Sequence, residues 1–263
     1  MKTELGGAAF LRVSAALCVS AALCVLASTC IKLEDPPKDV NAASKEADSP
    51  LMKALTPPTT TATKEGLAAA IVIDTSGSME RRAAKGNNIP KITYARAAAN
   101  DIVAQFARYA EDHKGEDVRL AIYEFSTRDG QERCREVVPM SAPNRDKART
   151  AIAQLRADGG TPIGDAMIKA KLALDATGLS RKHLLVVTDG ENTNGYDPDE
   201  VAVAINKRPE VERPSLYFVA FDVDAKIFAP VKTAGGLIMS ASSGKELNDT
   251  LDLLLRGKIL IEK

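Results

Sequence analysis

The chain has 263 residues, of which 45% are hydrophobic and 27% charged, so it can bury one sizeable core. Its 35 Lys and Arg residues balance 35 Asp and Glu residues, which argues against nucleic acid as a partner. Aromatic residues make up 4% and Trp is absent, so a stacking platform for bases or sugars is disfavoured. The four cysteines include no CxxC pair, which excludes a zinc site or a disulfide-stapled scaffold.

Residues 1–30 have the pattern of an export segment. Lys2 and Arg12 precede an uncharged apolar run, residues 13–31, with small residues just before Cys30. Three alternatives stay open: a cleaved signal peptide, a lipobox-like segment in which Cys30 is acylated, and an uncleaved membrane anchor, since about 20 apolar residues span a bilayer. Each alternative places the rest of the chain outside the cytoplasm, held in the cell envelope at the membrane or secreted.

Residues 31–66 are predicted to be a linker. Pro36-Pro37, Pro57-Pro58 and the Thr-rich run 59–63 interrupt any helical or strand period. A segment with so little apolar surface to bury is typical of a flexible tether.

Residues 67–257 alternate strands and helices. Continuous apolar runs such as 67–74 suit strands that are buried on both faces of a parallel sheet. The expected strands are 67–74, 118–126, 134–139, 182–188, 216–221 and 236–240, and the expected helices are 90–113, 144–157, 163–176, 199–207 and 245–255. This order predicts a doubly wound α/β domain whose six-stranded sheet is mostly parallel, with helices on both faces and one antiparallel edge strand. Residues 258–263 are predicted to be a C-terminal tail.

Three polar loops follow or adjoin the ends of the buried strands. The first contains Asp74, Ser76 and Ser78, the second contains Thr161, and the third begins with Asp189. Ligands of open α/β sheets bind outside the carboxyl ends of the strands, so we expect these loops to converge. Hydroxyl and carboxylate oxygens are ligands that Mg²⁺ accepts. Because hydroxyl ligands add no charge, a metal held here would stay electrophilic toward a carboxylate from another molecule.

The motif Asp74-x-Ser76-x-Ser78, together with Thr161 and the Asp189 of Thr-Asp-Gly, resembles the metal-ion-dependent adhesion site of von Willebrand factor A domains. The resemblance extends over about residues 67–255 and implies a doubly wound sheet. It also implies that the three hydroxyls ligate the metal directly, whereas the two carboxylates act mainly through water or as hydrogen-bond partners. The metal would be Mg²⁺, Mn²⁺ or Ca²⁺, and the partner would be a protein whose acidic residue completes the coordination.

Enzymatic alternatives find less support in the sequence, and we expect no catalytic activity. No GxSxG elbow surrounds Ser76 or Ser78, and the histidines His113 and His183 are expected at the sheet edge opposite the three loops. A metal-dependent hydrolase would have to use Glu191 as its base, although Glu191 and its neighbours are better interpreted as the rim of the site.

Two further alternatives remain open. The domain could be an assembly or regulatory subunit of a larger complex, and the loop 80–88 could contact a partner directly. In the simplest structural interpretation, Asp74 and Asp189 would be no more than helix N-caps.

Overall fold

The computed structural model describes residues 49–58, 63–85, 88–128 and 131–262. The predicted export segment and its candidate lipid attachment site, Cys30, therefore lie outside the described residues. Among the residues that are described, no helix has the length and apolar character needed to cross a membrane.

The described strands form one six-stranded sheet in the order β3-β2-β1-β4-β5-β6. Strand β2 pairs with β3 in the antiparallel direction, and every other neighbouring pair is parallel. This arrangement confirms the predicted mostly parallel sheet with an antiparallel edge strand. The strands are β1 (Lys64–Asp74), β2 (Val118–Arg128), β3 (Gln131–Ser141), β4 (Leu179–Thr188), β5 (Ser215–Phe221) and β6 (Leu237–Ala241).

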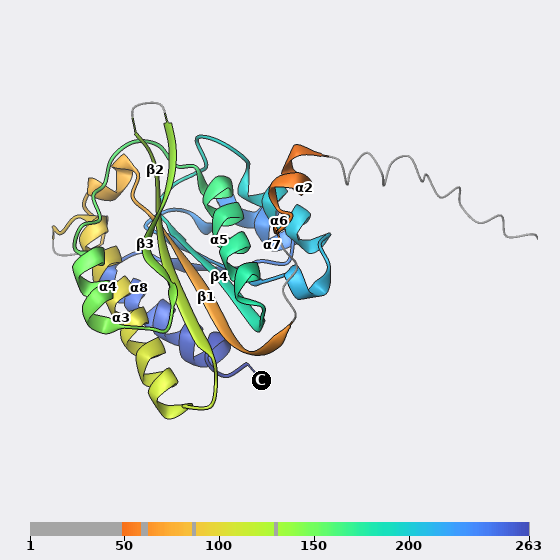
Figure 1. Ribbon diagram of the computed structural model, residues 1–263. Helices are drawn as coiled ribbons and strands as arrows, with labels where there is room; N and C mark the ends of the chain where they lie inside the picture. The colour runs from red at the N-terminus through yellow and green to blue at the C-terminus, as the bar shows by residue number, and fades with distance from the viewer. Residues whose placement is uncertain (1–48, 59–62, 86–87, 129–130, 263) are drawn as a thin grey trace, which may run out of the picture. The chain divides into compact units, whose positions relative to one another are not determined.

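Helices cover both faces of the sheet (Figure 1). One face carries α3 (Lys91–Asp112), α4 (Arg145–Ile152) and α8 (Gly244–Leu254), and the other carries α5 (Ile163–Thr177), α6 (Pro198–Asn206) and α7 (Ala229–Thr233). The central strand β1 contributes side chains to the cores on both faces of the sheet, because alternate side chains of a strand point to opposite faces. Ile71 and Ile73 pack in the first core, whereas Ala70 and Val72 pack in the second. The apolar run that predicted β1 is thus buried on both sides.

The segment expected to be a linker differs from that expectation in its second half. Helix α2 (Pro50–Ala54) begins after Ser49, whose hydroxyl accepts a hydrogen bond from the Met52 amide at 3.2 Å. Leu55, directly after the helix, is fully buried in the core that contains α5 and α6. Strand β1 begins at Lys64, three residues before the predicted start of the domain. Sequence composition alone hid this docking, because the few apolar residues that carry it, Leu55 with Leu51 and Met52 beside it, stand among Ser, Pro and Thr residues.

The C-terminal end also differs from the expected tail. A π-helical turn, η4 (Leu255–Ile259), continues α8, and Ile259 is fully buried in the core beneath α3. Part of the segment 258–263 therefore belongs to the packed domain.

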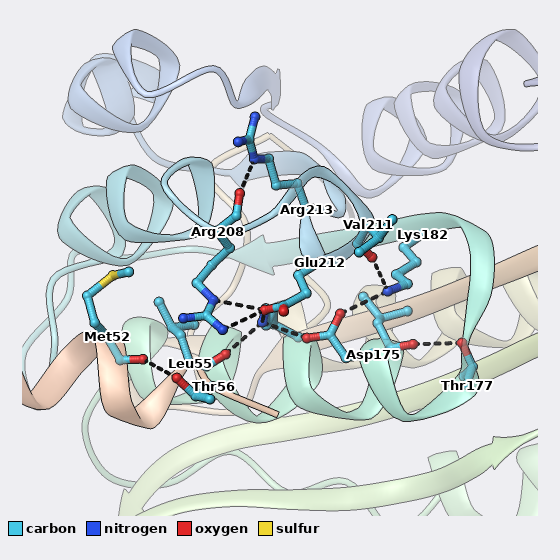
Figure 2. Close-up of polar contacts among 12 residues, drawn as sticks. Met52, Leu55, Thr56, Asp175, Thr177, Lys182, Arg208, Val211, Glu212 and Arg213 are labelled. Atoms are coloured by element: carbon cyan, nitrogen blue, oxygen red, sulfur yellow. Dashed lines mark hydrogen bonds and ion pairs between the residues drawn. The ribbon is translucent and has the colours of Figure 1, made fainter. Parts of the chain in front are cut away.

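A buried ion network holds Leu55 in place (Figure 2). The Lys171 ammonium on α5 is completely buried and donates to the Leu55 carbonyl oxygen at 2.6 Å. It also pairs with Asp175 at 2.6 Å and with Glu212 at 3.3 Å. Lys182 completes the network by binding the other Asp175 oxygen at 2.9 Å. A buried ammonium is costly unless its protons are bound, so the Leu55 carbonyl fills a required acceptor position.

We predict that Leu55→Ala releases the α2 segment while the domain stays folded. A buried Leu→Ala change costs about 2–5 kcal/mol, and here we expect the loss to fall on the short α2 segment, which can open locally. Limited trypsin digestion should cleave after Lys53 at least about tenfold faster, with an unchanged circular dichroism spectrum. Leu253→Ala, at a position that is 65% exposed, is the matched control and should leave the rate unchanged. An unchanged cleavage rate in Leu55→Ala would show that the leucine does not hold the segment.

Candidate functional site

The site is organised around the Asp74 carboxylate at the end of β1. Ile73 pairs with Val187 on β4, so the parallel register brings the carboxyl ends of these two strands to the same level. Asp74 is fully buried, and its Oδ1 accepts a hydrogen bond from the Ser76 amide at 2.7 Å. Its Oδ2 accepts one from the Thr188 hydroxyl at 2.6 Å. The carboxylate therefore ties the first polar loop to the strand that leads into the third.

A chain of hydroxyls continues from this carboxylate to the second one. Ser76 and Ser78 flank the start of a short 3-10 turn, η1 (Gly77–Glu80), and their Oγ atoms lie 2.9 Å apart. The Ser78 hydroxyl donates to Asp189 Oδ1 at 2.6 Å. Since that bond uses the only Ser78 proton, Ser76 is the donor to Ser78. Four of the five predicted site residues thus share one hydrogen-bonded cluster.

The fifth predicted residue, Thr161, lies in the loop packed between the other two. Gly159, two residues before Thr161, accepts a hydrogen bond from the Gly77 amide at 2.8 Å. This bond joins the second loop to residues 76–78, which we call the serine turn. The Thr161 carbonyl accepts one from the Thr193 amide at 3.0 Å, which joins it to the third loop. Thr161 is 5% exposed, so the backbone of both neighbouring loops fixes its position at the same end of the sheet.

Side chains of the third loop fix the start of α5. Asn192 accepts a hydrogen bond from the Ile163 amide at 2.8 Å, and the Thr193 hydroxyl accepts one from the Thr161 amide at 2.7 Å. Gly164 allows the close approach, because a Cβ atom there would lie 2.0 Å from the Tyr196 carbonyl oxygen. The sequence analysis placed these loop residues at the rim. The structure shows that two of them also satisfy amides at the start of α5.

The two carboxylates interact unfavourably when both are charged. Burial, together with the smaller effect of the nearby Asp189 charge, raises the pKa of Asp74 from 3.8 to about 6. Hydrogen bonds from Ser76 and Thr188 oppose this shift but do not cancel it. A pair of buried carboxylates of this kind favours a nearby cation.

The structure places two charged residues at the site that the sequence analysis missed. The buried Lys91 ammonium, at the first residue of α3, lies 2.6 Å from Asp189 Oδ2 and 3.5 Å from Asp222 Oδ2. Asp222 follows the last residue of β5 and has a positive φ of 57°. The strand-end argument that selected Asp74 and Asp189 applies equally to Asp222 and could have found it. No comparable signal marks Lys91.

The histidines lie away from this cluster, as predicted. His183 is near the start of β4, is fully buried, and stacks on Tyr217 with ring centroids 5.9 Å apart. Burial, assisted by the charge of Arg181, lowers the pKa of His183 to about 4, so the ring is neutral at pH 7. His113 caps the C-terminal end of α3, whereas Lys91 is the first residue of this 22-residue helix. Neither imidazole can reach the serine hydroxyls.

The atoms at the site that could bind a metal ion are hydroxyl and carboxylate oxygens. The described residues contain no group of three or more His, Cys, Asp or Glu side chains that could hold a metal. A cation bound here would therefore depend on the hydroxyls of Ser76, Ser78 and Thr161 as well as on the two carboxylates. Hard oxygen ligands of this kind suit Mg²⁺, Mn²⁺ or Ca²⁺ rather than a soft metal.

A doubly wound sheet with polar loops at the carboxyl ends of its strands is the arrangement in which open α/β sheets bind their ligands. Residues 69–191 match the family model for the von Willebrand factor type A domain. The resemblance deduced from the sequence is thereby confirmed.

A human relative and two bacterial structures are similar to the chain. Inter-alpha-trypsin inhibitor heavy chain H4 from Homo sapiens is 33% identical over 161 residues, which cover 58% of this chain and 15% of that protein. The PilB minor pilin from Streptococcus sanguinis superimposes with a TM-score of 0.57 at 14% identity, covering 77% of this chain and 63% of the pilin. The von Willebrand domain of the type V pili tip protein Mfa5 from Porphyromonas gingivalis superimposes with a TM-score of 0.56 at 14% identity. The match covers 77% of this chain and 98% of that structure. The chain thus spans a small part of the human relative, and the two structures share its fold.

Proposed function

We propose that this domain is a metal-ion-dependent protein-binding module of the adhesion type, tethered outside the cytoplasm. The observation that carries the proposal is the hydrogen-bonded cluster of Asp74, Ser76, Ser78 and Asp189, with Thr161 fixed beside it. The residues fit a divalent cation, because two buried carboxylates need positive charge and the hydroxyls supply neutral oxygens. We expect Mg²⁺, with Mn²⁺ or Ca²⁺ as substitutes.

The bound metal would supply an electrophilic position that a carboxylate from another protein can fill. Two aspartates at most neutralise a divalent ion, so the loaded site carries no net negative charge that would repel an acidic ligand. Glu80, Arg81 and Arg82 are exposed directly after the serine turn and would face such a partner. The match of residues 69–191 to the von Willebrand factor type A domain supports an interaction module, and the pilus proteins among the similar structures are consistent with a surface location.

The first of three predictions from this proposal concerns the effect of metal on stability. Saturating Mg²⁺ at about 100 times its Kd should stabilise the fold by about 2.7 kcal/mol relative to chelator, which corresponds to a rise in Tm of several degrees. Ser76→Ala should remove most of this rise. Ser141→Ala, at the end of β3 that pairs with Leu120 near the start of β2, is the control and should keep it. Coinciding melts of the wild-type protein with Mg²⁺ and with chelator would contradict a metal site.

The second prediction concerns the partner. Immobilised protein should retain an envelope protein in Mg²⁺ and release it in chelator, and Asp or Glu→Ala changes in that partner should identify the residue that completes the coordination. Thr161→Ala and Asp189→Ala should weaken the interaction about as much as chelator does, while both variants stay folded by circular dichroism. Thr150→Ala, on the exposed part of α4, serves as the control. A folded variant that has lost its metal and still binds at full strength would place the contact elsewhere, for example on the loop 80–88.

The third prediction concerns export and anchoring, for which residues 1–30 provide the basis. The intact mass of the envelope form should correspond to a chain that begins at an acylated Cys30. A chain cleaved after Ala27 without lipid would contradict lipidation but keep export. A full-length chain that starts at Met1 and partitions with membranes would favour the uncleaved anchor.

A further inference from the structure

Lys91 occupies an unfavourable position for a cation. It is the first residue of a 22-residue helix, at the end where the helix dipole is positive, and its side chain is 7% exposed. Burial and the dipole therefore both oppose the ammonium charge. Two carboxylates offset that cost, Asp189 at 2.6 Å and Asp222 at 3.5 Å. A lysine held in this way places a positive charge beside the proposed metal site.

The ammonium and the serine hydroxyls contact different oxygens of Asp189. Ser78 donates to Oδ1, whereas Lys91 lies against Oδ2. The lysine thus fixes the orientation of the carboxylate that faces the serines, and at the same time it offsets part of the negative charge that would attract a divalent ion.

Asp222 pairs with the same ammonium. Its Oδ2 also accepts a hydrogen bond from the Ala84 amide at 3.1 Å, so it connects the end of β5 to the segment after the serine turn. The Lys91 amide in turn donates to the Arg81 carbonyl oxygen at 2.9 Å. The lysine, Asp222 and the serine turn are therefore held together by backbone contacts as well as by charge.

We propose that Lys91 is a built-in counter-ion that weakens divalent-cation binding at the Asp74–Asp189 site, and that Asp222 controls its strength. The inference rests on the proposed function. Counting Asp74, Asp189 and Lys91, a site loaded with a divalent ion carries one excess positive charge, which favours an anionic ligand on the metal. Asp222 partly neutralises the ammonium, so the two residues have opposite effects on metal affinity. Lys91 acts on the metal through Asp189 and through space, and it is a positioning residue rather than a ligand.

Calorimetric titration with MgCl₂ alone tests the proposal on the folded protein. Lys91→Gln keeps a hydrogen-bond donor for Asp189 but removes the charge, and it should tighten Mg²⁺ binding about tenfold, because a nearby unit charge repels the ion strongly at low dielectric. Asp222→Asn keeps an acceptor for the Ala84 amide but removes the charge, and it should weaken Mg²⁺ binding severalfold. In the double variant the effect of Asp222→Asn should shrink, as expected for residues that are coupled.

Lys182→Gln is the matched control, since Lys182 is also a buried, ion-paired lysine but lies toward the start of β4, away from the site. Its Kd for Mg²⁺ should equal that of the wild type. An unchanged or weakened affinity in Lys91→Gln would overturn the inference, as would an unchanged affinity in Asp222→Asn if Lys91→Gln does not fold. Absence of Mg²⁺ binding by the wild-type protein would instead overturn the proposed function itself.

Discussion

The arrangement of the polar loops depends on one constraint: a carboxylate is buried at the end of the central strand. Asp74 closes an apolar run that packs against helices on both faces, and it is itself fully buried. A carboxylate in that position requires donors for both oxygens. The Ser76 amide and the Thr188 hydroxyl supply them, so satisfying Asp74 dictates the turn of the first loop and its attachment to β4. The serine hydroxyls continue the chain of hydrogen bonds, from Ser76 to Ser78 and from Ser78 to Asp189.

Charge explains why this end of the sheet contains a lysine as well as aspartates. Asp189 and Asp222 both follow strands that end at the same edge as Asp74, and both pair with one ammonium, that of Lys91. Lys91 is the only cation for which an ion pair with two of these carboxylates is recorded among the described residues. Without it, the cluster would attract divalent ions more strongly but would also be less stable as an empty site. The lysine thus links the stability of the fold to the affinity of the proposed metal site.

The sequence predicted the sheet and the convergence of the loops because both follow from local patterns. Continuous apolar runs identify strands that are buried on both faces, and parallel strands bring their carboxyl ends together. The Lys91–Asp222 contact joins residues 131 positions apart, and nothing local at residue 91 distinguishes a lysine that turns inward from an ordinary surface lysine at the start of a helix. The docking of Leu55 was missed for a similar reason, since its anchor is a buried ammonium on α5 that is 116 positions away. In both cases the deciding interaction is a long-range ion contact inside the protein, which hydrophobic periodicity does not encode.

The same geometry argues against a hydrolytic role for the serines. A nucleophilic serine needs a base that accepts its proton, but the Ser78 hydroxyl donates to Asp189, whose other oxygen is already paired with Lys91. Both oxygens of that carboxylate are therefore already engaged. His183 is six residues before Asp189 along an extended strand, about 20 Å away, and its ring faces Tyr217. Glu191 is exposed at the rim rather than turned into the cluster. The hydroxyls therefore offer hydrogen-bond donors and neutral oxygens, an arrangement that agrees with the proposed capture of a cation and an acidic partner.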